Sequence, residues 1–232
     1  MWDYASLTKL ITEKIMSASQ TGKPVRILTY ILGIAGVVML VLGISIYGVA
    51  AAELGSQRIT VAALDPGHPG SNAGKPVHGP FTALSQVKAI THHLGEASQT
   101  ATGGTKDPTT GVVTGGDETL TYGTAPSFTL DAQGNCVGDL ALWTDPAGQG
   151  TIQCTKGSAP QVTGSLDAKA LSGLRGTLTT GSFLIASLFV SVLAFGVAAL
   201  IAALGAVFIL ITVMHLLSAK QAVRAASQSA TE

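Results

Sequence analysis

Histidine and acidic side chains in the middle of the chain are the groups whose types and spacing could support chemistry. His92 and Glu96 are four residues apart, which would place both side chains on one face of a helix. With His68 they could supply two imidazoles and one carboxylate, the ligand set of many iron(II) sites. Two further histidines, His78 and His93, lie in the same part of the chain.

The surrounding sequence does not strengthen this metal hypothesis. The adjacent His92 and His93 would point to different faces of a helix, no HExxH or CxxC motif accompanies them, and solvated surface histidines explain the same pattern. A GxSxG elbow, a P-loop and a GxGxxG motif are also absent from the sequence. We therefore assign no catalytic residue, metal ligand or cofactor and do not expect an enzyme, although a metal-dependent enzyme in this segment stays an alternative.

The two cysteines, Cys136 and Cys154, both lie in the same middle segment. Their spacing is not that of a redox CxxC pair, and in an oxidising compartment they would join to each other. The sequence therefore predicts a structural disulfide, closing a loop of about 19 residues and contributing about 3 kcal/mol in the chain-entropy model.

Two long stretches without a charged residue, 27–52 and 176–219, enclose this middle segment. The first, as a helix, would reach about 39 Å, more than the roughly 30 Å hydrocarbon core of a bilayer. The second is longer than one span needs, so we place its membrane part at 181–214. Only 11% of all residues are charged, against about 25% in an average soluble domain. The sequence predicts a membrane protein with two transmembrane helices that flank a small α+β extracytoplasmic domain.

The flanking charges predict the orientation. Residues 1–26 hold four basic and two acidic residues, the C-terminal tail is also net positive, and residues 54–180 hold nine acidic residues against seven basic ones. By the positive-inside rule, both termini are expected in the cytoplasm and the middle domain outside the plasma membrane. The charge is balanced and includes no basic cluster of the kind that binds nucleic acid. Lipids and membrane proteins are therefore the expected partners.

The expected division of the chain follows from these observations. It consists of a cytoplasmic amphipathic helix at 1–24, a first span at 25–52, an outer domain at 53–180, a second span at 181–214 and a cytoplasmic tail at 215–232. Within the outer domain, apolar spacing predicts a helix at 81–98, Thr/Gly-rich composition predicts a linker at 98–117, and short β-branched segments predict a β-meander at 118–156. Its strands are expected at 119–122, 127–130, 139–144 and 151–154, after a short strand at 59–63.

Small residues recur along both predicted spans. Such residues let helices approach closely in lipid, where packing drives association. The predicted helix-packing residues are Gly33, Gly36, Gly43, Ser187, Ser191, Ala194, Ala198, Ala202 and Ala206. The two spans are expected to use them against each other or against a partner.

Two stretches of the sequence also carry a resemblance. Residues 182–198, SFLIASLFVSVLAFGVA, and residues 74–86, GKPVHGPFTALSQ, resemble a family of actinobacterial two-span membrane proteins, many of which are labelled aromatic ring-opening dioxygenase. With the first span, the resemblance covers about half of the chain; the β-rich stretch 111–165 departs from the short form of that pattern. The family supplies no active site to carry over to this sequence.

The resemblance implies a setting in the actinobacterial respiratory supercomplex, in which cytochrome bc1-like and aa3 oxidase complexes carry small accessory membrane proteins. We therefore expect a non-catalytic accessory subunit of that supercomplex. The alternative function is a stand-alone envelope protein that binds a cell-wall or lipid component through its outer domain.

Overall fold

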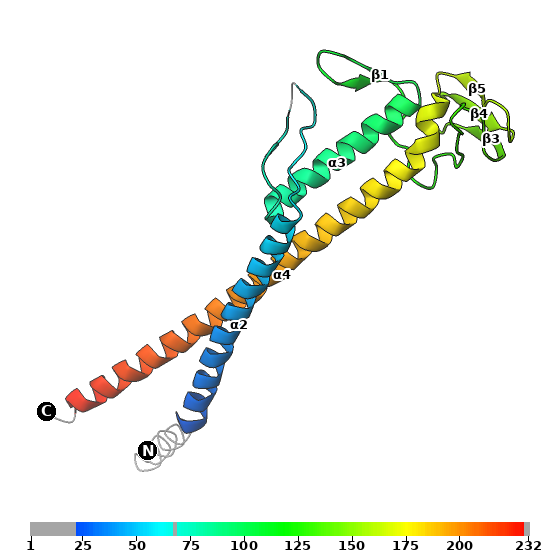
Figure 1. Ribbon diagram of the computed structural model, residues 1–232. Helices are drawn as coiled ribbons and strands as arrows, with labels where there is room; N and C mark the ends of the chain where they lie inside the picture. Colours follow the sequence, from blue (N-terminus) through cyan, green and yellow to red (C-terminus); the bar gives the residue numbers. More distant parts are fainter. Residues whose placement is uncertain (1–21, 67–68, 230–232) are drawn as a thin grey trace, which may run out of the picture. The chain divides into compact units, whose positions relative to one another are not determined.

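A computed structural model describes residues 22–66 and 69–229 (Figure 1). The amphipathic helix expected at 1–24 lies almost entirely outside these residues. Two compact units make up the described chain, and each is treated by itself below. Residues 22–49 and 196–229 form unit 1, and residues 50–195 form unit 2.

Two long apolar helices, α2 (Gly22–Ser56) and α4 (Ala168–Ser229), flank a small α+β region. Both are long and apolar enough to cross a membrane, and only 17% of the most apolar stretch of each is buried within the protein. The core helix of a soluble protein would be mostly buried. These helices therefore expose apolar side chains in the manner expected of helices surrounded by lipid.

Helix α4 begins well before the span expected at 181–214. Asp167 starts it by accepting the backbone N–H of Ala170 on Oδ1 at 3.0 Å, as an N-cap aspartate does. The first turns are amphipathic, with Leu171, Leu174 and Leu178 buried. Residues 168–180, which precede the expected span, thus belong to the same helix, and their leucines fill the core of unit 2.

Helix α3 (Pro80–Ala101) confirms the helix expected at 81–98. Proline at the first helical position has the backbone angle that a helix needs and lacks the N–H that would stay unpaired there. Thr82 Oγ1 accepts the backbone N–H of Gly79 at 3.2 Å. The helix ends at Ala101, and the chain turns away at Gly103, whose φ of 97° is left-handed and favours glycine.

The segment 98–117, expected as a linker, has structure of its own. Strands β1 (Thr105–Lys106) and β2 (Val113–Thr114) pair antiparallel. In the turn between them, the backbone N–H groups of Thr110 and Thr109 donate to Asp107 Oδ1, and these bonds hold the pKa of Asp107 below its ordinary value. Most of this segment is turn and loop, and short Thr and Asp side chains let it also form a small hairpin without large apolar anchors.

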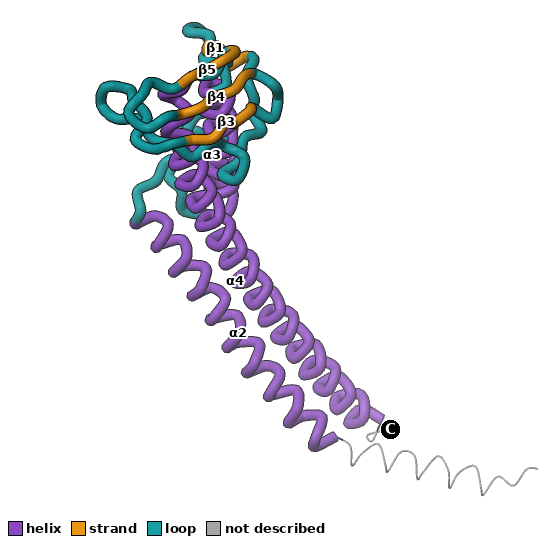
Figure 2. The backbone as a smooth tube through the Cα atoms, turned by 90° about the vertical axis from the view of Figure 1, so that its right-hand side faces the viewer, coloured by secondary structure: helices purple, strands orange, loops and turns teal. Residues whose placement is uncertain are grey.

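The meander expected at 118–156 is formed only in its second half. Strands β3 (Leu140–Thr144), β4 (Gly150–Cys154) and β5 (Gln161–Gly164) make an antiparallel sheet in that order (Figure 2). Residues 119–122 form no strand, because Thr121 and Thr124 close a turn through their hydroxyl groups. Residues 127–130 contribute one isolated bridge, Leu130 to Cys136, and the strand expected at 59–63 is reduced to a bridge from Thr60 to Pro76.

Two apolar clusters form the core of unit 2. One joins the sheet to the end of α3 and the start of α4, with Ile152, Ala101 and Leu171 fully buried. The other joins α3, through Val87, to Leu188 and Leu54 of the long helices. Since Leu94 of α3 packs on Gly181 and Val87 lies in the cluster with Leu188, α3 and the first part of α4 run antiparallel.

The predicted disulfide is confirmed. Cys136 and Cys154 are bonded, with their Cα atoms 5.7 Å apart, and both are 2% exposed in the first cluster. Cys154 ends β4, and the backbone N–H of Cys136 donates to the carbonyl oxygen of Ser158 at 2.9 Å. The bond therefore fastens the loop before β3 to the sheet.

Replacing both cysteines, Cys136→Ser and Cys154→Ser, should lower the free energy of unfolding of unit 2 by about 3 kcal/mol, because the unfolded chain regains the freedom that the closed loop removes. The measurement is urea unfolding of the detergent-solubilised full chain, followed by Trp143 fluorescence in a Trp2→Phe background. Reduced wild-type protein should match the double variant. A midpoint that neither change moves would show that the sheet does not depend on the bond.

Candidate functional site

The contact between α2 and α4 in unit 1 is built on glycine. A Cβ added to Gly36 would lie 2.8 Å from the carbonyl oxygen of Gly205, and one added to Gly43 would lie 2.7 Å from that of Ala198. These distances are shorter than any real Cβ contact. The two backbones can therefore approach this closely only where both helices carry small residues.

A threonine completes the contact toward the helix ends. Thr212 is buried, and its hydroxyl lies 3.4 Å from the carbonyl oxygen of Thr29 while it donates to the carbonyl oxygen of Phe208 at 2.8 Å. A Cβ on Gly33 would meet the Thr212 side chain at 2.9 Å. Polar groups of this kind act between helices where no water competes for their bonds.

The predicted packing residues divide into two groups. The three glycines Gly33, Gly36 and Gly43 face α4 in unit 1, and among the alanines Ala198 and Ala202 contact Gly43. Ser187 and Ala206 are exposed, and Ser191 and Ala194 are half-buried. The predicted residues on α4 therefore do not all lie on its contacting face, on which the contacts include positions 198, 202, 205 and 212.

Gly205 and Thr212 were missed by the sequence analysis. A Cβ on Gly205 would lie 2.6 Å from both the Gly36 carbonyl oxygen and the Leu40 nitrogen, so its lack of a side chain matters as much as that of Gly36. A sequence pattern that could have revealed these two residues is small residues separated alternately by three and four positions. Such spacing averages 3.5 residues and keeps the small residues on one face of the helix.

A cluster of titratable side chains lies in unit 2. His92 Nε2 is 3.3 Å from Asp65 Oδ2 and 3.9 Å from Glu96 Oε1. One potential ligand atom from each of these three residues lies within 4.8 Å of the others. This confirms that α3 brings His92 and Glu96 to one face and shows that Asp65, which the sequence analysis did not consider, joins them.

Two further side chains surround Glu96. His93 Nδ1 lies 3.1 Å from Glu96 Oε2, and His93 Nε2 lies 2.9 Å from the carbonyl oxygen of Ala63. Lys106 Nζ, from β1, lies 3.4 Å from Glu96 Oε1. Glu96 thus links α3, the segment 59–78 and the β1–β2 hairpin.

The other two histidines of the middle segment are not placed in this cluster. His68 lies outside the described residues. His78 is exposed before α3, where its backbone N–H donates to Thr82 Oγ1 at 3.2 Å. Local sequence spacing does not predict that Asp65 joins the cluster, because its position depends on a reversal of the chain. In this reversal the backbone N–H of Val61 donates to the carbonyl oxygen of Lys75 at 2.9 Å.

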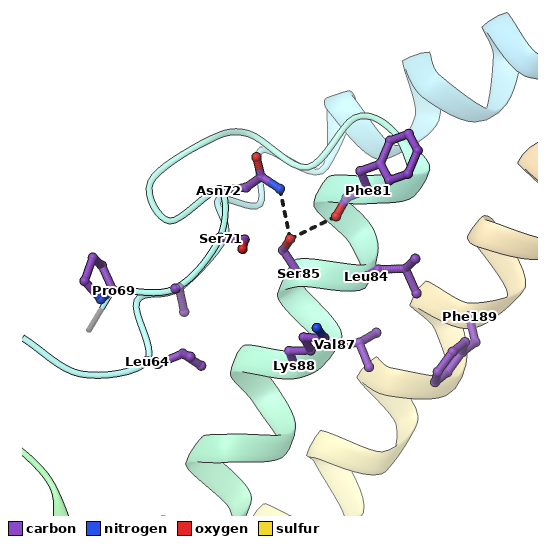
Figure 3. Close-up of a pocket in the computed structure, with 12 residues that line it drawn as sticks. Leu64, Pro69, Ser71, Asn72, Phe81, Leu84, Ser85, Val87, Lys88 and Phe189 are labelled. Carbon is purple, nitrogen blue, oxygen red and sulfur yellow. Dashed lines mark hydrogen bonds between the residues drawn. The ribbon is translucent and has the colours of Figure 1, made fainter.

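Unit 2 also contains an apolar pocket with a volume of about 620 Å³ (Figure 3). Leu84 and Val87 project from α3 toward the part of α4 that carries Phe189, and Leu64 lies across from them on the segment 59–78. Asn72 and Ser85, joined by a 3.0 Å hydrogen bond, hold that segment to α3. The lining suits an apolar chain better than a polar molecule.

Searches of this chain against protein-family models, curated proteins and solved structures find no match.

Two glycines of α4, Gly205 and Gly196, give a matched test of the α2–α4 contact. Gly205→Leu should disrupt the contact by forcing the backbones apart, at a cost of about 1–3 kcal/mol. Gly196→Leu should be tolerated, because no atom lies within 4 Å of a Cβ at that position. The readout is oxidative cross-linking of cysteines introduced by Thr29→Cys and Thr212→Cys. Cross-linking should persist with Gly196→Leu and fall with Gly205→Leu; equal yields in the two variants contradict the contact.

Proposed function

We propose that this chain is a non-catalytic accessory subunit of a membrane-protein assembly in the plasma membrane. Its two helices would span the bilayer, with both termini in the cytoplasm and the disulfide-bonded domain outside. The observation that carries the proposal is the apolar outer surface of the long helices. Large side chains remain exposed along them, including Ile34, Val49, Phe183, Val190 and Leu193, each at least 67% exposed.

The small residues at the centre of the α2–α4 contact are used within the chain, so a partner would meet a hairpin that is already formed. Gly36, Gly43 and Gly205 contact the opposite helix, while Ser187 and Ala206 remain exposed on α4. Small exposed residues beside large apolar ones suit packing against further transmembrane helices. The outer domain adds a second surface for neighbours.

The resemblance to actinobacterial two-span proteins supplies the identity of the proposed assembly. It points to the respiratory supercomplex that joins cytochrome bc1-like and aa3 oxidase subunits, which would be the integral membrane partners. The chain itself would hold no redox cofactor in this role. Lipids would cover the helix faces that protein partners leave free.

Affinity purification from native membranes tests this proposal. Membranes solubilised in a mild detergent would be purified through a tag at the C-terminus, with an untagged strain as the control. Haem absorbance and mass spectrometry should show bc1-like and oxidase subunits in near-stoichiometric amounts, because apolar helix contacts survive gentle extraction.

The apolar pocket favours a second candidate, a stand-alone envelope protein that binds a lipid component. Leu64, Leu84 and Phe189 line the pocket, and the nearby Phe81 is 78% exposed. In the same purification, a protein that carries lipid but no other subunit would support this candidate and contradict the accessory-subunit proposal.

A further inference from the structure

The cluster of Asp65, His92 and Glu96 has buried polar atoms that the described residues leave unpaired. Asp65 Oδ1 is inaccessible to solvent and has no hydrogen-bond partner among the described residues. His92 Nε2 is equally buried and faces the carboxylates of Asp65 and Glu96, at 3.3 Å and 3.9 Å, without forming a hydrogen bond to either. The Asp65 and Glu96 side chains are each only 11% exposed. Leaving a buried carboxylate oxygen without a partner costs free energy. A bound ligand would supply the partner that the protein's own groups do not provide.

The charges around the cluster favour a cation as that ligand. Asp65 and Glu96 contribute two carboxylates within one small space, while Lys106 is the nearest ammonium and is 56% exposed. Lys106 lies against Glu96 Oε1, and no described cation other than the histidines pairs with Asp65. Part of the carboxylate charge is therefore available to an ion held between the three residues.

The donor types narrow the choice of ion. Two carboxylates and one imidazole suit a divalent transition metal such as Zn²⁺ or Mn²⁺, whereas Ca²⁺ and Mg²⁺ prefer oxygen alone. Ligands of a tetrahedral zinc ion stand about 3.4 Å apart, given bonds of about 2.0–2.2 Å. The separations of His92 Nε2 from Asp65 Oδ2 and Glu96 Oε1, 3.3 Å and 3.9 Å, are close to that value.

A supporting group is also present. His93 reaches Glu96 Oε2 with one ring nitrogen and the Ala63 carbonyl oxygen with the other. Groups in this position orient a metal-binding carboxylate and fix its rotamer. Glu96 Oε1 stays directed toward His92.

From this geometry we propose that Asp65, His92 and Glu96 form a binding site for one divalent transition-metal ion of the Zn²⁺ type in the outer domain. Three protein ligands leave a coordination position for water. The ion would join the segment 59–78 to α3 and would displace Lys106 from Glu96. This site is independent of the accessory-subunit proposal, because it depends on residues of unit 2 alone.

The test uses the full chain in detergent, carrying a tag without histidine and stripped with a chelator. Calorimetric titration with Zn²⁺, Mn²⁺ and Ca²⁺ should give one Zn²⁺ per chain, weaker Mn²⁺ and no competing Ca²⁺. Asp65→Asn and His92→Gln should each weaken Zn²⁺ binding at least tenfold. His93→Gln should weaken it about tenfold, as loss of an orienting group does.

Two variants guard against loss of folding as the explanation. Lys106→Met keeps all three ligands and removes the competing ammonium, so it should bind Zn²⁺ more tightly than the wild type. His78→Gln removes an exposed histidine outside the cluster and should bind as the wild type does. Absence of a stoichiometric ion in the wild type, or unchanged binding in Asp65→Asn and His92→Gln, overturns the proposal.

Discussion

The backbones of α2 and α4 meet at glycine, and unit 1 depends on this approach. Lipid offers no hydrophobic gain for bringing two apolar helices together, so their association depends on close packing and on bonds between them. Gly43 and Gly205 provide the closest packing, and Thr212 places a hydroxyl 3.4 Å from the Thr29 carbonyl oxygen. A side chain at either glycine would require the helices to move apart.

Helix α4 packs in two different ways along one uninterrupted sequence. Its first turns bury Leu171, Leu174 and Leu178 in the core of the outer domain, where the hydrophobic effect acts. Further along, the small residues Ala198 and Gly205 let the backbone of α4 lie close to that of α2. The same helix therefore changes from leucine packing to small-residue packing along its length, and this change fits a passage from a water-exposed domain into lipid.

The sequence predicts some of these features well because they depend on local patterns. Two uncharged stretches identify the long helices, and the two cysteines predict the disulfide. The beginning of α4 was harder to predict. Its three leucines lie at helical spacing but are separated by polar residues and glycine, so the stretch does not look like part of an apolar helix. Strand β5 was missed because Gln161–Gly164 is exposed at every position and carries no burial pattern. The cluster of Asp65, His92 and Glu96 was only partly predictable from the sequence, because Asp65 reaches His92 through a chain reversal that no local spacing encodes.

The proposed membrane partners depend on how unit 2 is oriented across the membrane, and thiol labelling in intact cells measures this orientation directly. A cysteine introduced by Ala147→Cys, at an exposed position between β3 and β4, is compared with one introduced by Gln221→Cys, exposed near the C-terminal end of α4. A membrane-impermeant maleimide should label position 147 in intact cells and position 221 only after the cells are permeabilised. Labelling of position 221 in intact cells, or protection of position 147, would contradict the two-span arrangement with cytoplasmic termini.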